Sequence, residues 1–372
     1  MIDVFAFYFP QLYVTEENSL WWGEGFTDWQ LTKEAKPLFE GHHQPRVPRL
    51  GYQDQSSPQV LNNQVQLASR YGLAGFNFYH YWFDSKAYLD VPILNLLSDK
   101  SLDTKFMLTW ANESWTRQWV GKPNEYLIEQ KYYSNQSEVD KHYRYLSKCF
   151  LDHRYYRIDG RPVLAIYRPE LIPDLRSVLA RFNSLAQDDG FKSIYFMACR
   201  SYDLPNSREL YHDFQGIINF NPRYVVNSFL KDSKVTGLEK YFRLLPEKWQ
   251  SKLVTIRNVN KKHVIYSYRD VVKAFNHVPA FEGDIPVYQS VFPDWDNTAR
   301  YSSRATLFSD VTEARFKEMI KLAISNSTES HEKVLFVNAW NEWSESAYLE
   351  PDTTKGYKYL EILSEAVKCS SH

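Results

Sequence analysis

The chain has few cysteines and no long run of apolar residues. Only 3 of its 372 residues are cysteine, at positions 149, 199 and 369 without a C-x-x-C pair, which argues against a disulfide framework and a zinc knuckle. The apolar runs fall far short of the roughly 20 residues that cross a bilayer, so we expect no transmembrane helix. An excess of either charge is also missing, since 44 Lys and Arg face 45 Asp and Glu. This balance argues against nucleic acid or an anionic membrane surface as the main partner.

The N-terminal residues lack the pattern of a signal peptide. An acidic residue, Asp3, precedes a short apolar run that ends at Pro10, whereas a signal peptide has a basic start and a longer apolar stretch. Together with the free cysteines, this pattern predicts a cytoplasmic protein.

Aromatic residues, in contrast, are abundant, with 11 Trp, 27 Tyr and 23 Phe making up 16% of the chain. Trp and Tyr each carry a polar tip that needs a partner when it is buried. A surplus of them is typical of a site where flat apolar faces, such as those of a sugar, meet aromatic rings. Composition leaves a large aromatic core open as the alternative.

Eight short apolar or aromatic runs alternate with amphipathic stretches of helical period, which predicts parallel strands covered on both faces. The expected strands are Val4–Phe9, Gly75–Phe83, Lys105–Trp110, Pro162–Tyr167, Ser193–Cys199, Gly216–Phe220, Pro286–Val291 and Val334–Trp340. The expected helices include Val60–Tyr71, Ser137–Phe150, Leu175–Leu185, Asp270–His277 and Val311–Ile324, the last with an N-cap at Ser309-Asp310.

This alternation predicts an α/β fold, a single (β/α)8 TIM barrel over residues 1–372 with long strand-to-helix loops. A doubly wound open sheet is the alternative. It is disfavoured because neither G-x-G-x-x-G nor a P-loop follows the first strand.

Carboxylates interleaved with Trp and Asn follow several of these strands. The carboxyl ends of barrel strands share one rim, where barrel enzymes carry their chemistry, so we expect these side chains to gather there and bind substrate. They are Trp22, Glu24, Asp28 and Trp29 after the first strand, His80 and Tyr81 in the second, Trp110, Asn112, Glu113 and Trp115 after the third, Asp294 and Trp295 after the seventh, and Asn341 and Trp343 after the eighth.

Glu342 and Glu345 are the predicted catalytic residues. Carboxylates among aromatic rings suit glycosidic chemistry, because one must hold a proton for the leaving oxygen while the other stays ionised. Three residues apart, their Cα atoms are at most roughly 10 Å from one another. That reach covers the separations of roughly 5 to 9.5 Å used by retaining and inverting glycosidases. Spacing alone does not choose between them, and a solvated E-x-x-E turn is the competing interpretation.

Other motifs leave alternatives open. The D-x-D of Asp294 and Asp296 resembles the metal-holding motif of nucleotide-sugar transferases, but it lacks a matching Rossmann context. The adjacent His42 and His43 have no third ligand nearby, and we predict no metal site. His80 is either a donor to substrate or a core histidine, and Glu113 is either an active-site carboxylate or an ion-pair partner.

At these motifs the sequence closely resembles the WbsX family, bacterial proteins encoded with surface-polysaccharide genes and related to glycoside hydrolase family 99. The resemblance runs nearly end to end and is carried by WWGEGFTDW at residues 21–29, GFNFYHYWF at 75–83, WANESWTR at 110–117, VFPDWDN at 291–297 and NAWNEWSE at 338–345. The relation to family 99 rests on the W-N-E-W-x-E segment and the barrel. Ser344 stands where family 99 often has histidine.

The resemblance implies a retaining mechanism, since family 99 contains endo-acting mannosidases. By motif match, Glu342 would deprotonate the substrate 2-hydroxyl, which attacks the anomeric carbon to give a 1,2-anhydro sugar, and Glu345 would protonate the leaving oxygen. We therefore expect a carbohydrate-active enzyme of surface-polysaccharide (O-antigen or capsule) metabolism that needs no cofactor. Its expected partners are oligosaccharides or polysaccharides, with peripheral contact to lipid-linked glycans at the inner membrane face left open. The alternatives are a metal-dependent nucleotide-sugar transferase and a non-catalytic glycan-binding barrel.

Overall fold

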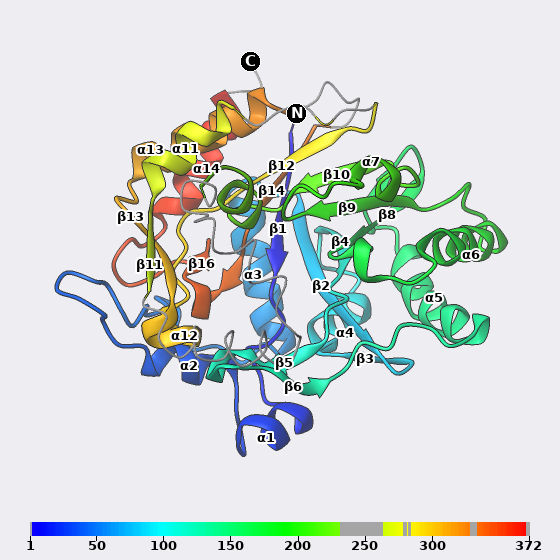
Figure 1. The fold of residues 1–372 in the computed structure, drawn as a ribbon, viewed down its shortest axis with the longest axis horizontal. Helices are drawn as coiled ribbons and strands as arrows, with labels where there is room; N and C mark the ends of the chain where they lie inside the picture. The colour runs from blue at the N-terminus through cyan, green and yellow to red at the C-terminus, as the bar shows by residue number, and fades with distance from the viewer. Residues whose placement is uncertain (1, 231–262, 278–280, 282–283, 328–332, 370–372) are drawn as a thin grey trace, which may run out of the picture.

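A computed structural model describes residues 2–230, 263–277, 281, 284–327 and 333–369. Within these residues, parallel strands close into a barrel, because β1 pairs with β14 on one side and with β2 on the other (Figure 1). Around the barrel the strands are β1 (Asp3–Tyr8), β14 (Val334–Val337), β12 (Val287–Val291), β10 (Gly216–Asn219), β9 (Tyr195–Arg200), β8 (Arg161–Ile166), β4 (Lys105–Trp110) and β2 (Gly75–Phe83). The predicted (β/α)8 barrel is confirmed, and each strand overlaps the range expected from the sequence.

Aromatic side chains fill much of the barrel interior. Every residue of β2 is buried, as a near-continuous apolar run predicts for a strand covered on both faces. The ring of Phe7 stacks on Tyr79 with a centroid distance of 5.5 Å and meets Phe220 edge-on at 5.2 Å. Part of the aromatic surplus therefore lies in the core, which was one of the two interpretations that the composition left open.

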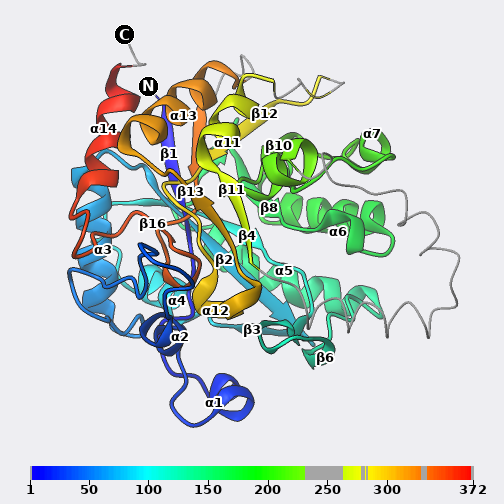
Figure 2. The ribbon, with the colours of Figure 1, turned by 60° about the vertical axis from the view of Figure 1, so that its left-hand side comes forward.

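Helices cover the outside of the barrel (Figures 1 and 2). On α3, for example, the apolar residues at helical spacing, Leu61, Val65 and Ala68, are buried toward the strands. The main covering helices are α3 (Pro58–Arg70), α4 (Val91–Ser98), α5 (Gln136–Phe150), α6 (Leu175–Asp188), α11 (Tyr268–Phe275), α13 (Glu313–Ser325) and α14 (Lys358–Cys369). None of the helices in the described residues is long and apolar enough to cross a membrane.

The predicted start of α13 was wrong. Its N-cap is Thr312, whose hydroxyl accepts a hydrogen bond from the backbone N–H of Arg315. Ser309 instead ends β13 (Thr306–Ser309), which pairs with β11 (Val264–Ser267). Asp310 adopts a positive φ of 54° and accepts a hydrogen bond from the Tyr268 backbone N–H, so it forms a turn between strand and helix.

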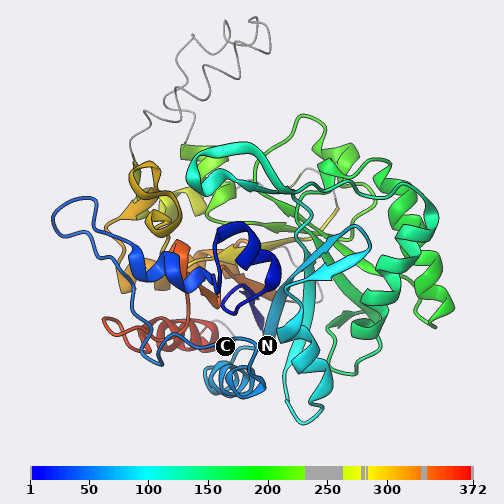
Figure 3. The same ribbon diagram turned by 90° about the horizontal axis from the view of Figure 1, so that it is seen from below.

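The long connections gather at the carboxyl ends of the strands, the end seen in Figure 3. They carry short elements of their own, because a long loop that covers a site needs internal hydrogen bonds. These elements are α1 (Glu16–Trp22), α2 (Asp28–Glu34), β3 (Lys86–Tyr88), β5 (Trp115–Arg117), η1 (Gln118–Val120), β6 (Lys122–Ile128), α8 (Arg223–Val225), α12 (Thr298–Tyr301), β15 (Asn341–Glu342), η6 (Trp343–Glu345) and β16 (Ala347–Tyr348).

Two glycines in the barrel wall give a matched test of its packing. A Cβ at Gly75 would lie 1.7 Å from the backbone oxygen of Lys105 on β4, whereas a Cβ at Gly216 would meet only side chains, the nearest atom being Cε2 of Tyr288 at 2.9 Å. We expect Gly75→Ala to lower the free energy of unfolding by more than about 3 kcal/mol, because two strands must separate, and Gly216→Ala by about 1–3 kcal/mol. Urea unfolding monitored by circular dichroism measures both, and equal losses would contradict the prediction.

Candidate active site

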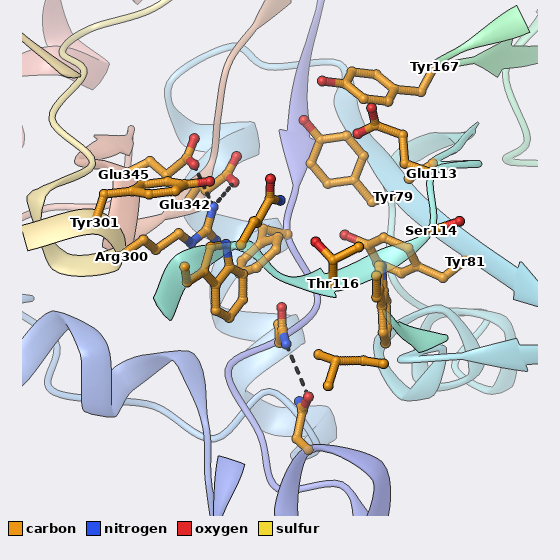
Figure 4. A pocket seen from close by; sticks show the side chains of 18 of the residues that line it. Tyr79, Tyr81, Glu113, Ser114, Thr116, Tyr167, Arg300, Tyr301, Glu342 and Glu345 are labelled. Carbon is orange, nitrogen blue, oxygen red and sulfur yellow. Dashed lines mark hydrogen bonds and ion pairs between the residues drawn. The ribbon is translucent and has the colours of Figure 1, made fainter. Parts of the chain in front are cut away.

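A pocket of about 160 Å³ opens at the carboxyl ends of the strands. Figure 4 shows the glutamate pair with Arg300 and Tyr301 on one side and an aromatic wall on the other. Residues from several strand-to-helix connections line it: Phe9, Gln11, Asn18, Trp21, Trp22, Tyr79, Tyr81, Ala111, Glu113, Ser114, Trp115, Thr116, Gln118, Trp119, Leu127, Tyr167, Phe220, Arg223, Trp295, Arg300, Tyr301, Asn338, Glu342 and Glu345.

One guanidinium group joins the two predicted catalytic carboxylates. Nη1 of Arg300 lies 3.0 Å from Oε1 of Glu342 and 2.7 Å from Oε1 of Glu345, as the dashed lines in Figure 4 show. Glu342 is 8% exposed and Glu345 is 4% exposed, so both open only toward the pocket. Two residues three apart in an extended segment could not both reach a single nitrogen. Here the chain turns at η6, and this turn brings both carboxylates onto Nη1 of Arg300.

Burial perturbs this pair. The pKa of Glu342 is raised to about 7, because desolvation by burial and the nearby charge of Glu345 together outweigh the opposing effect of Arg300. Asp28, on α2, is a third carboxylate in the group, with Oδ1 3.6 Å from Nη2 of Arg300. Its pKa is also raised, mainly because the group is buried. Three carboxylates therefore depend on one cation.

Aromatic rings hold Arg300 in place. Its guanidinium carbon lies 4.9 Å from the ring centroid of Phe9 and 5.0 Å from that of Trp119. Trp119 also stacks on Trp22, and its backbone oxygen accepts a 2.8 Å hydrogen bond from Nη2 of Arg304. Such packing favours the charged form in a site with little water.

The loop that carries the glutamates is fixed by buried hydrogen bonds. The side chain of Asn341 accepts from the Phe9 N–H at 2.8 Å and donates to the Phe9 carbonyl at 3.1 Å. The indole N–H of Trp343 donates to Glu350 at 2.7 Å, and the Trp343 ring stacks on Tyr348 at 3.8 Å. The backbone of Asp296 donates to the Glu345 carbonyl at 2.8 Å. These bonds leave the two carboxylates facing the pocket.

The opposite wall is formed by phenol rings and one more carboxylate. Tyr79, Tyr81, Tyr167 and Glu113 face the glutamate pair across the pocket in Figure 4. Glu113 forms an ion pair with Arg168. Tyrosine hydroxyls and ring faces together offer hydrogen bonds and apolar contacts, which is the combination that a sugar ring presents.

Of the residues predicted to bind substrate, five line the pocket together with the glutamate pair: Trp22, Tyr81, Glu113, Trp115 and Trp295. Asp28 lies directly behind them against Arg300. The structure brings these residues together from strand β2 and from the connections after β1, β4 and β12.

The other predicted residues lie outside the lining. Asn341 and Trp343 hold the catalytic loop, as described above. His80 is fully buried and bonded to His142 at 2.8 Å, and burial lowers its pKa to about 3, so it is a neutral core histidine. Asn112 bonds to the backbone N–H and carbonyl of Arg168. Trp110 is fully buried, Trp29 donates to the Gln53 carbonyl, and Glu24 is exposed in the loop after α1.

The D-x-D carboxylates are occupied by protein partners. Asp294 pairs with Arg46 at 2.8 Å, and Asp296 accepts hydrogen bonds from the side chains of His42, Gln44 and Thr298. No group of three or more His, Cys, Asp or Glu within the described ranges is placed to hold a metal ion.

Sequence reasoning missed the cation of the site. Arg300 follows the D-W-D-N motif by only a few residues and lies in the short helix α12 of the connection after β12. Its position, like that of Tyr301, was detectable from the rule that strand-end loops carry the site. Tyr167 ends a predicted strand, Tyr79 lies in the middle of one and Arg223 follows one, but a single tyrosine or arginine at such a position is a weak signal.

The fold and pocket define a (β/α)8 barrel with an acidic, aromatic-walled site at the carboxyl ends of its strands. The chain belongs to the WbsX glycosyltransferase family, whose model matches residues 4–363. It is 31% identical over 368 residues to the uncharacterized protein WxcX of two strains of Xanthomonas campestris pv. campestris, B100 and ATCC 33913. The match covers 97% of this chain and 49% of WxcX, so the chain spans about half the length of these curated relatives.

Solved structures share the fold. A GH99 endo-alpha-mannosidase from Bacteroides thetaiotaomicron superposes with a TM-score of 0.56 at 18% identity, covering 100% of both chains. Its complex with bis-tris propane gives 0.57 at 16% identity over 100% of this chain and 99% of that one. A glycoside hydrolase-like protein gives 0.59 at 13% identity over 98% of this chain and 93% of the other. Family membership supports a carbohydrate-active enzyme.

The raised pKa of Glu342 predicts a pH-dependent stability. In the folded protein the pKa of Glu342 is about 7, against an ordinary value of 4.5. The folded state therefore binds the proton more tightly than the unfolded state. The resulting stabilisation is fully present below pH 4.5 and is lost as the pH rises from 4.5 to about 7. Relative to Glu342→Gln, the free energy of unfolding of the unsubstituted protein should fall by up to about 1.4 kcal/mol per pH unit over that interval.

Urea unfolding across this pH interval measures the difference between the two proteins. Glu24→Gln, which removes an exposed carboxylate outside the pocket, is the control and should show no such slope. A constant difference between the unsubstituted protein and Glu342→Gln would mean that Glu342 ionises normally.

Proposed function

We propose that this protein is a carbohydrate-active enzyme that makes or breaks glycosidic bonds in surface-polysaccharide metabolism, with a retaining mechanism and with residues 1–372 acting as one barrel domain. The observation that carries the proposal is the pair Glu342 and Glu345, both buried at the pocket and both in contact with Nη1 of Arg300. The WbsX membership and the GH99-like barrel support the same chemistry.

The geometry suits a division of labour between the two glutamates. A carboxylate with a pKa of about 7 is poised to accept a proton at neutral pH, which fits Glu342 as the base that assists the substrate 2-hydroxyl. As the 2-oxygen bonds to the anomeric carbon, the bond from that carbon to the leaving oxygen breaks and Glu345 donates a proton to the leaving oxygen. In the second step Glu345 removes a proton from the incoming acceptor, whose oxygen bonds to the anomeric carbon, and Glu342 returns its proton to the released 2-oxygen. When that acceptor is water the reaction is hydrolysis, and when it is a sugar hydroxyl the reaction is transfer.

Arg300 has a positioning role in this scheme. Because its Nη1 contacts both carboxylates, it can stabilise whichever glutamate is ionised while the other carries the proton. The mechanism requires that alternation, since the acid must be protonated at the moment when the base is not.

The nucleotide-sugar transferase alternative has less support, because Asp294 and Asp296 are both buried and bound by Arg46 and His42. We expect full activity in the presence of a chelator such as EDTA. The assay incubates the protein with the host's own polysaccharide and lipid-linked precursors, with and without nucleotide sugars, and determines product masses. Loss of activity that is restored by a divalent cation would support the alternative.

The general acid is tested by Glu345→Gln, which preserves the shape of the side chain but removes its proton. Turnover of a substrate with a poor leaving group should fall by roughly 100-fold or more. Glu24→Gln is the matched control and should keep full turnover, since Glu24 is exposed outside the pocket. Unchanged turnover in Glu345→Gln would exclude the assignment, and glycan binding without any product would indicate a non-catalytic barrel.

A further inference from the structure

The charged residues of the pocket are unevenly paired. Among the residues that the structure describes, three carboxylates line it, Glu113, Glu342 and Glu345, together with the two guanidinium groups of Arg223 and Arg300. Arg300 contacts both members of the glutamate pair, and Glu113 forms an ion pair with Arg168, outside the lining. Each of these carboxylates therefore contacts a guanidinium group, whereas Arg223 contacts none of the three.

The side chain of Arg223 has no hydrogen bond or ion pair with any residue that the structure describes. It begins α8, directly after the cis Asn221-Pro222 bond that follows β10, and it is exposed. Its guanidinium carbon lies 5.9 Å from the ring centroid of Tyr167, so the group is directed toward the aromatic wall of the pocket. The neighbouring acidic groups, Tyr167 first, raise its pKa, and the side chain is a full cation at every physiological pH.

A second pocket adjoins the first at this residue. It has a volume of about 230 Å³ and is lined by Pro222, Arg223, Val226, Asn227, Tyr266, Trp295, Asn297, Thr306 and Phe308. Arg223 and Trp295 belong to both pockets. None of the described residues that line the second pocket is a carboxylate, so a negative group placed there meets Arg223 without the repulsion it would meet beside the glutamate pair.

The chemistry of arginine narrows what this position recognises. A guanidinium group presents a planar fork of N–H donors that matches the two oxygens of a carboxylate or a phosphate. Neutral sugar hydroxyls are served equally well by amides and phenols, which the pocket already offers in Gln11, Asn18 and its tyrosines. A free guanidinium adds a preference only when the ligand carries an oxyanion.

We propose that Arg223 binds an oxyanion substituent of the glycan, a uronic acid carboxylate or a phosphate group, at the junction of the two pockets. The substrate class is then an acidic rather than a neutral glycan. This inference rests on the proposed function and refines it. A competing role for Arg223 is to offset the glutamate charges at a distance, and that role gives no preference between charged and neutral glycans.

The experiment measures which oligosaccharides the protein retains. A partial hydrolysate of the host's surface polysaccharide is separated by anion exchange into neutral and acidic fractions. Each fraction is passed over immobilised Glu345→Gln protein, which holds substrate without turning it over. The same is done with Arg223→Met and Arg223→Lys in that background. Arg70→Met is the control, since Arg70 is an exposed arginine on α3.

We expect the acidic fraction to be retained preferentially. Its affinity should fall about 10- to 100-fold in Arg223→Met, recover in part in Arg223→Lys, and stay unchanged in Arg70→Met. Carbodiimide-mediated carboxyl reduction of the bound oligosaccharides should abolish the preference if the oxyanion is a uronate, and hydrofluoric acid dephosphorylation should abolish it if the oxyanion is a phosphate.

Two results would overturn the inference, and they differ in what they leave standing. Retention of the neutral fraction, unaffected by Arg223→Met, would remove the acidic substrate class while the carbohydrate function stands. Retention of neither fraction by any of the proteins would count against the carbohydrate function and the inference together.

Discussion

The contact of one arginine with two buried glutamates is the interaction on which the rest of the site depends. Two carboxylates that share a water-poor pocket repel each other, and burial adds a further penalty for each charge. Arg300 offsets both, and Asp28 behind it adds a third negative group to the same cation. With fewer positive than negative groups, the cluster favours holding a proton near neutrality, which is the property that acid–base chemistry at a sugar requires.

The barrel makes this cluster possible by joining segments far apart in the chain. Asp28 comes from the connection after β1, Arg300 from the one after β12, and the glutamates from the one after β14. Buried hydrogen bonds from Asn341 to the backbone of Phe9 tie the last of these connections to the first. A rigid circle of strands thus fixes the ends of loops that have little regular structure of their own.

The sequence predicted the strands because a parallel strand that is buried on both faces is a nearly continuous apolar run, which can be recognised without knowing its neighbours. It predicted the glutamate pair because their motif lies at a strand end. It did not distinguish His80 from the pocket residues Tyr79 and Tyr81, because adjacent residues of a strand point to opposite faces and the register of the strand decides which of them enters the pocket. Asn112 lies in the loop after β4, where the sequence pattern does not show which way a side chain points. Arg300 was missed since a lone arginine in a loop becomes informative only when its partners are known. The start of α13 was misplaced because Ser309 is equally suited to a strand end and to a cap.

One hydrogen bond between two loops couples their lengths. The hairpin after β4 places the ring of Trp119 against the guanidinium group of Arg300. Arg304, from the connection after β12, donates a hydrogen bond to the backbone carbonyl of the same tryptophan. Neither connection can change length by itself without moving the ring that steadies the guanidinium. A change of length in either segment would therefore need a matching change in the other to keep the ring on the guanidinium, so the two connections form one mechanical unit over the pocket.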